Sequence, residues 1–199
     1  HGGTHADAPI HFAQNGRTME QISIEEWIGP AVLLDVKVKC AKDPDYLLSM
    51  ADVEAWEKRF GRIPAKSWVI MYTGVDTRHY PNRLKVLGTE KTGPEAVAEL
   101  RFPGFSPEVA EWLIRKRGIR GIAIDTPSID RGQSKDFAVH RLVCGLDRLI
   151  LENIAGCDKL PASGATLYVI PMLIEKGTGA PARVFARLPV VVKPDKSSE

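Results

Sequence analysis

The sequence lacks the features of a disulfide-stapled, membrane-spanning or nucleic-acid-binding protein. Only three cysteines occur in 199 residues, an odd number in a chain long enough to fold without cross-links. No apolar run approaches the ~20 residues that a membrane-spanning helix needs. Lys and Arg total 27 against 25 Asp and Glu, so the net charge of +2 shows no basic excess. We therefore expect reduced thiols, a cytoplasmic location, no nucleic-acid or membrane partner, and a small-molecule substrate.

The sequence also has no Gly-x-Ser-x-Gly motif, which counts against a serine hydrolase. It contains no internal repeat or low-complexity tract. Because 44% of its residues are hydrophobic, the chain can bury a core, and we expect a single domain over residues 1–199. The chain starts at His1 inside its most informative motif, so we expect further residues upstream.

The pattern of apolar residues predicts a mixed α/β domain with more strand than helix. A helix capped by Asp52 is expected over residues 53–60, a second one should start at Pro107 and stop at Gly118, and residues 23–27 should form a helical turn. The expected strands are residues 31–38, 68–72, 119–125, 167–171 and 183–192. Residues 76–105 are rich in Pro and Gly and predict a long surface loop or an oligomerisation arm.

Three of the five histidines fall within the first eleven residues, together with Asp7. Imidazole and carboxylate groups are the usual ligands of zinc, manganese and similar divalent ions. Two glycines and a proline argue against a helix here, so we expect a kinked loop leading into an extended segment. Alternate residues of an extended segment share a face, so His5 and Asp7 should point the same way while His1 folds back. The pattern predicts a metal site, and solvated terminal histidines without a ligand are the alternative.

The complete pattern His-x-Gly-Thr-His-x-Asp-x-Pro-x-His at residues 1–11 resembles the signature of the cyclase family of metal-dependent hydrolases, the group of kynurenine formamidase and isatin hydrolase. The similarity continues at residues 104–107, 121–130 and 140–153. It implies a swivelling β/β/α fold, with strands that precede the motif, in a homodimer or homotetramer. It also implies hydrolysis of a small amide, either a cyclic amide such as isatin or an aryl formamide such as N-formylkynurenine.

The resemblance also assigns site residues. Its metal ligands map to His1, His5 and Asp7, completed in formamidase-like members by His140 and Glu152. Asp7 would then bridge two ions, and we expect one or two ions of zinc or manganese. Twelve residues of unbroken helix would leave the side chains of His140 and Glu152 about 120° apart, so the chain must break between them. Gly145 is the candidate for that break.

The remaining candidates concern catalysis and substrate. The resemblance makes His11 catalytic, and an imidazole suits the role of general base and acid. Asp125 ends an expected strand and is a candidate to orient a ligand imidazole, although such a residue often only caps a turn. Ser128 is a candidate to line the pocket, with an ordinary turn serine as the alternative. Trp27 follows the motif closely and is a candidate to face an aromatic substrate, with an ordinary place in the core as the plainer alternative.

Two other functions stay open from the sequence. A non-catalytic metal-binding domain would bind an ion but would have no need of His11. A lyase or cyclase activity is suggested by the family name alone. The complete motif, His11 included, favours hydrolysis of a C–N amide bond by metal-activated water.

Overall fold

The computed structural model describes residues 1–75 and 82–189. Its strands are β1 (His5–Asp7), β2 (Ile28–Asp35), β3 (Leu47–Leu48), β4 (Trp68–Tyr72), β5 (Gly104–Phe105), β6 (Gly121–Ile124), β7 (Leu149–Glu152), β8 (Ala165–Pro171) and β9 (Gly179–Arg187). Its α-helices are α1 (Lys37–Cys40), α2 (Met50–Phe60), α3 (Arg83–Leu87), α4 (Pro94–Val97), α5 (Pro107–Trp112) and α6 (Ala138–Gly145). Shorter helical segments are η1 (Pro9–His11), η2 (Met19–Gln21), η3 (Ile24–Trp27), the π-helical η5 (Leu113–Arg117) and η6 (Cys157–Lys159). The predicted mixed, strand-rich α/β class is confirmed.

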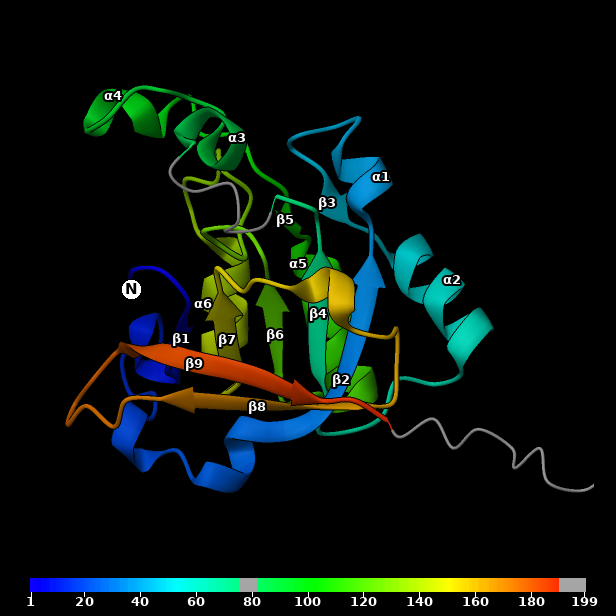
Figure 1. The fold of residues 1–199 in the computed structure, drawn as a ribbon. Coiled ribbons are helices and arrows are strands. Elements are labelled where there is room, and N and C mark those ends of the chain that lie inside the picture. Colours follow the sequence, from blue (N-terminus) through cyan, green and yellow to red (C-terminus); the bar gives the residue numbers. More distant parts are fainter. Residues whose placement is uncertain (76–81, 190–199) are drawn as a thin grey trace, which may run out of the picture.

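Four parallel strands form the centre of the fold. Strands β2, β4, β6 and β7 lie side by side (Figure 1). All five residues of β4 are apolar or aromatic and buried, as expected for a parallel strand that is covered on both faces. Strand β8 pairs antiparallel with β2, β9 with β8, and β1 with both β9 and β7. Seven strands therefore close into a barrel.

Alternate residues of the central strands face two different apolar clusters. One cluster includes Val69 and Ile122 and packs against α2, α5 and α6. The other includes Trp68 and Ile70 and packs against β8 and the segment before β2. Figure 1 shows α5 and α6 behind the central strands and the β8–β9 hairpin in front of them. This two-sided burial explains why the central strands are almost entirely apolar.

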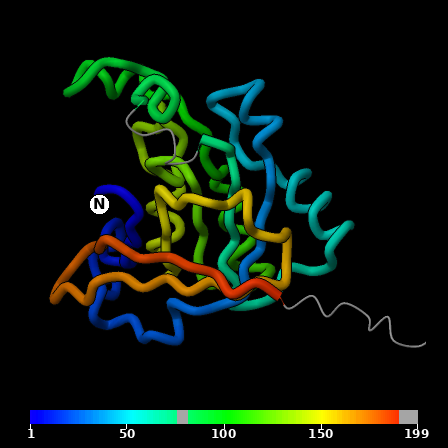
Figure 2. The backbone as a smooth tube through the Cα atoms, in the orientation of Figure 1, coloured from blue at the N-terminus to red at the C-terminus, as the bar shows by residue number. Residues whose placement is uncertain are grey.

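The N-terminal segment lies beside the C-terminal hairpin (Figure 2). In the register of the sheet His5 is opposite Glu152 on β7 and opposite Pro181 on β9. Three residues of β1 thus stand between two longer strands. The opening motif is held by backbone hydrogen bonds to parts of the chain more than 140 residues away in the sequence.

Most predicted elements appear within a few residues of their expected positions, with one correction at a helix start. Helix α2 begins at Met50, after Ser49, so Asp52 is not its cap. Asp52 instead sits in the first turn and accepts a hydrogen bond from the Ser49 backbone N–H at 2.8 Å, as in a capping box. The end of the expected strand at 183–192 lies outside the described residues.

The segment 76–105 is only partly described, because residues 76–81 lie outside the described ranges. The rest is not a structureless loop, since it contains α3, α4 and β5, and β5 pairs with β3. A role for this segment in oligomerisation stays a prediction. Within the described ranges, no helix combines the length and the apolar character that crossing a membrane requires.

Candidate metal centre

Strand β1 places His5 and Asp7 on one face of the sheet. The Nε2 atom of His5 is 3.5 Å from Oδ1 of Asp7, as expected for alternate residues of an extended segment. Glu152 lies opposite His5 on β7, and its Oε2 is 3.1 Å from His5 Nε2. The other ring nitrogen of His5 is 2.9 Å from the Gly3 carbonyl oxygen, which turns Nε2 toward the carboxylates.

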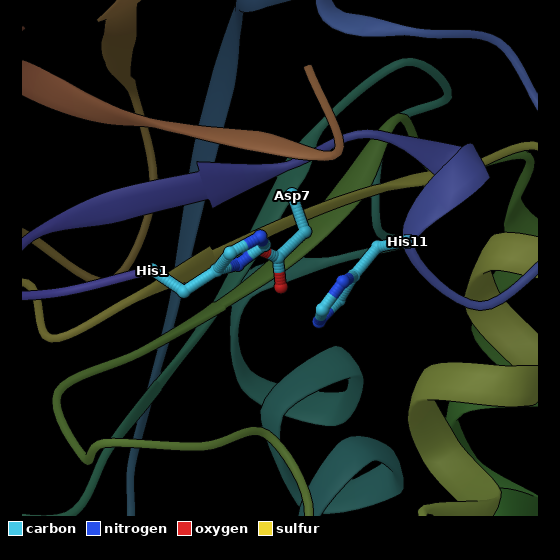
Figure 3. A group of neighbouring side chains, drawn as sticks. All are labelled: His1, Asp7 and His11. Carbon is cyan, nitrogen blue, oxygen red and sulfur yellow. The ribbon is translucent and has the colours of Figure 1, made fainter. Parts of the chain in front are cut away.

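His1 and His11, the first and last residues of the opening motif, lie on the same side of the centre as His5. Gly3 has a φ of +63°, and the chain turns back there so that His1 Nδ1 lies 2.7 Å from Asp7 Oδ1. The rings of His1 and His11 stack with centroids 4.1 Å apart. Figure 3 shows the side chains of His1, Asp7 and His11 pointing toward a common space. One potential ligand atom of each lies within 4.8 Å of the others.

Helix α6 and strand β7 supply the other side of the centre. Helix α6 ends at Gly145, as predicted, and this break lets His140 and Glu152 converge. His140 Nε2 is 3.1 Å from Glu152 Oε1 and 3.5 Å from Asp7 Oδ2. The two oxygens of Asp7 therefore face different histidines. The structure brings all five predicted ligands together, with the Asp7 carboxylate between two groups of donors.

Asp130 is a member of the centre that the sequence analysis missed. Its Oδ2 lies 2.6 Å from His140 Nδ1, and it also accepts the backbone N–H groups of Val139 and His140 at 3.0 and 3.1 Å. These N–H groups belong to the first turn of α6, where helix donors have no partner within the helix. Asp130 thus fixes both the ring and the backbone of His140. The available signal was a second acidic residue five positions after Asp125, in the loop that leads to the helix carrying His140.

The contact expected of Asp125, with the imidazole of a candidate ligand, is made by Asp130. Asp125 accepts hydrogen bonds from the backbone N–H and the hydroxyl of Thr73, at 2.9 and 2.8 Å, and from the Gly74 N–H at 2.9 Å. These hydrogen bonds fix the backbone directly after the end of β4. Ser128 contributes to the turn before Asp130, because its hydroxyl oxygen accepts the Asp130 N–H at 3.2 Å. This contact matches the plainer alternative, a turn serine.

Trp27 lies in the core, which agrees with the plainer alternative and not with a place facing the substrate. Its side chain is 1% exposed and stacks on Trp68 with ring centroids 6.2 Å apart. Both rings belong to the apolar cluster in front of the central strands. Trp27 ends η3 and leads into β2, so its large ring fills the space under β8.

Burial and charge set the protonation of the centre. Asp7 and Glu152 are 0% and 4% exposed, so their charges need cationic neighbours. Burial works to lower the pKa of His140, but the hydrogen bond to Asp130 and the nearby carboxylates of Asp7 and Glu152 outweigh it and raise this pKa to about 11. The pKa of His5 is also raised, since its bond to Glu152 and the charge of Asp7 outweigh burial. Burial lowers the pKa of His11, which favours its neutral imidazole.

A divalent cation fits this set of donors. Within the described ranges, Asp7 Oδ2 is buried and has no hydrogen-bond donor. In the same part of the chain, the ion pairs of Asp7 and Glu152 are all with histidines and none is with Lys or Arg. Two buried carboxylates among imidazole nitrogens form the oxygen and nitrogen environment of a zinc or manganese site.

Replacing Asp130 by asparagine is expected to weaken metal binding about 10- to 100-fold. The amide is a weaker acceptor than the carboxylate, so it holds the Nδ1–H form of His140 less firmly and makes Nε2 a poorer ligand. Competition with a chromogenic chelator measures the change. The control is Asp136→Asn, which makes the same chemical change at an exposed position of the same segment. Unchanged metal affinity in Asp130→Asn would show that Asp130 does not position a ligand.

Comparison with known proteins agrees with the geometry. The family model described as "Putative cyclase" matches residues 1–131. The isatin hydrolase of Roseibium aggregatum is 35% identical over 198 residues, which cover 95% of this chain and 72% of that protein. The kynurenine formamidase of Paracidovorax citrulli is 25% identical over 189 residues, covering 95% of this chain and 76% of that protein.

A solved structure is similar over the same length. Isatin hydrolase A from Ralstonia solanacearum superposes with a TM-score of 0.85 at 33% identity, covering 94% of this chain and 72% of that one. Both kinds of curated relative are named as hydrolysing enzymes, which confirms the predicted hydrolase class and does not favour a non-catalytic domain. With its motif, its fold and these relatives in agreement, the chain belongs to the cyclase family.

Proposed function

We propose that this protein uses a divalent metal, zinc or manganese, to hydrolyse a C–N bond of a small amide. The substrate is a cyclic amide such as isatin or an aryl formamide such as N-formylkynurenine. The observation that carries the proposal is the placement of the buried Asp7 carboxylate between two groups of histidine and carboxylate donors. The relatives named isatin hydrolase and kynurenine formamidase support both candidate substrates.

The chain offers ligands for one or two ions. His1 and His5 face one oxygen of Asp7, His140 faces the other, and Glu152 lies between His5 and His140. A divalent ion in such a site polarises a carbonyl as a Lewis acid and lowers the pKa of water. Asp130 and the Gly3 carbonyl hold the far nitrogens of His140 and His5, so the Nε2 atoms of both histidines face the centre.

His11 is the group that we assign to proton transfer. It lies on η1, directly after β1, and its half-buried ring reaches the centre from the side of His1. Amide hydrolysis requires removal of a proton from water and delivery of one to the leaving nitrogen. An imidazole that is neutral at neutral pH can perform both transfers. When the His11 ring takes up a proton, the carboxylates of Asp7 and Glu152 balance its positive charge.

The proposal also covers the assembly and the cellular location of the enzyme. The enzyme works as a homodimer or homotetramer in the cytoplasm, with residues 76–105 as the arm between subunits. A non-catalytic metal-binding domain is not favoured, because His11 stands in the centre beside the ligand set.

Metal removal tests the proposal. The protein is stripped with a chelator, then assayed on isatin and on N-formylkynurenine before and after zinc or manganese is added back. We expect hydrolysis of at least one substrate, no activity after stripping and recovery with metal. Zinc added to a boiled sample controls for catalysis by free metal. A metal-loaded protein that leaves both substrates intact would contradict the proposed substrates.

A further inference from the structure

Two phenylalanine rings continue the metal centre toward the surface. Phe12 directly follows His11, and its ring centroid is 4.7 Å from that of His11 and 4.8 Å from that of His140. Phe137 lies against both rings, with its centroid 5.6 Å from that of Phe12 and 6.1 Å from that of His140. The rings of His140, Phe12 and Phe137 therefore form a compact, roughly triangular aromatic cluster.

Phe137 is the exposed member of this aromatic cluster. Its side chain is 41% exposed, although it is a large apolar residue one turn before a buried metal-ligand candidate. Phe60 on α2 has almost the same exposure, 40%, but packs against Trp56, away from the centre. Exposed apolar area contributes little to folding, so the exposed part of the Phe137 ring is available to a ligand.

The backbone of Phe137 is held in an unfavourable conformation. Its φ and ψ of 49° and 47° lie in the left-handed region, which bulky residues rarely adopt. Its N–H donates to the Ser134 hydroxyl oxygen at 3.2 Å, and its carbonyl accepts the Arg141 N–H at 3.0 Å. Strain of this kind persists where the surrounding contacts enforce it, and it concentrates at ligand-binding positions. Here it fixes a ring at the edge of the centre.

We propose that Phe137, with Phe12 behind it, is a specificity-determining residue that receives the planar ring of an aryl substrate. The inference rests on the proposed function, because the scissile carbonyl must lie at the metal centre while the substrate ring lies against the aromatic cluster. Aromatic rings attract each other at centroid separations of about 4.5–7 Å, the range of the spacings within this cluster. A saturated ring of equal size lacks this electrostatic attraction to the phenylalanine rings and should therefore bind less tightly.

The test compares aryl and saturated ligands on the metal-loaded protein. Calorimetry measures the binding of benzohydroxamate and cyclohexanecarbohydroxamate, which chelate metal and need no hydrolysis. Kinetics measures the hydrolysis of formanilide and N-cyclohexylformamide. In Phe137→Leu we expect about fivefold to tenfold weaker binding of the aryl hydroxamate and a similar rise in KM for formanilide. We expect the saturated ligands to change less than about twofold and kcat to stay the same.

Two variants serve as controls. Phe137→Tyr keeps the ring and should behave as the wild type, and Phe60→Leu makes the same exchange at an equally exposed site away from the centre. The role of Phe137 would be overturned if Phe137→Leu lost the same affinity for aryl and saturated ligands, or lost no affinity for either. It would also be overturned if the wild type did not bind benzohydroxamate. Binding that depends on Phe137 without hydrolysis of either formamide would instead contradict the proposed hydrolysis. Hydrolysis of both formamides without ring preference would overturn only the aromatic contact.

Discussion

Asp7→Asn is expected to abolish metal binding at micromolar metal and, with it, amide hydrolysis. The carboxylate faces His1 and His5 with one oxygen and His140 with the other, so its loss weakens both groups of ligands. Partners outside the ligand set typically contribute 10- to 100-fold to affinity, so loss of the central ligand should cost more than about 100-fold. Competition with a chromogenic chelator gives the affinity.

Thermal unfolding provides a second measurement for Asp7→Asn. A ligand present at about 100 times its Kd stabilises the folded state by roughly 2.7 kcal/mol, so metal should raise the Tm of the wild type. The Tm of Asp7→Asn should not respond to metal. Asp158→Asn, which makes the same chemical change at an exposed position, should respond as the wild type does. A normal metal response in Asp7→Asn would contradict the assignment of this centre.

His11→Gln is expected to keep the metal and lose the reaction. General acid and base groups contribute about 10²- to 10⁴-fold, so kcat should fall by that factor while metal affinity changes little. Glutamine keeps a polar side chain of similar reach but cannot take up and return a proton. Steady-state kinetics and metal content are measured on the same preparations.

The contrast with His140→Gln makes the His11 experiment decisive. His140 approaches both Asp7 and Glu152, so its replacement should remove metal and activity together. His11 lies in one group with His1 and Asp7, with potential ligand atoms within 4.8 Å of one another, and this position would also suit a ligand. If His11→Gln lost metal as severely as His140→Gln, His11 would be a ligand and proton transfer would need another residue.

The sequence was most informative where local geometry decides the structure. Alternation in an extended segment predicted that His5 and Asp7 share a face, and the helix angle predicted a chain break near Gly145. Both arguments need only neighbouring residues and backbone geometry. For the same reason the buried strand at residues 68–72 was predicted with its observed bounds.

The errors arose where tertiary contacts decide the outcome. Asp125 and Asp130 are both acidic residues after β6, and only the path of the loop shows that Asp130 meets His140 while Asp125 meets Thr73. The place of Trp27 in the sequence left both the substrate and the core open, whereas the register of β2 and β8 places it in the core.

The short helices between residues 82 and 105 were missed because Pro and Gly dominated the pattern. Helix α3 carries a local signal, since the Asn82 side chain caps it by accepting the Lys85 N–H at 3.0 Å. Four- and five-residue helices show too little periodicity to stand out from such a background. The composition therefore favoured a loop.

The most direct test of the account is a titration of metal-free protein with zinc or manganese in which bound metal and the rate of amide hydrolysis are measured on the same samples. The account predicts that the rate rises in step with bound metal and levels off at one or two ions per chain. Full activity without metal, or saturation of the centre with no hydrolysis of isatin or N-formylkynurenine, would contradict it.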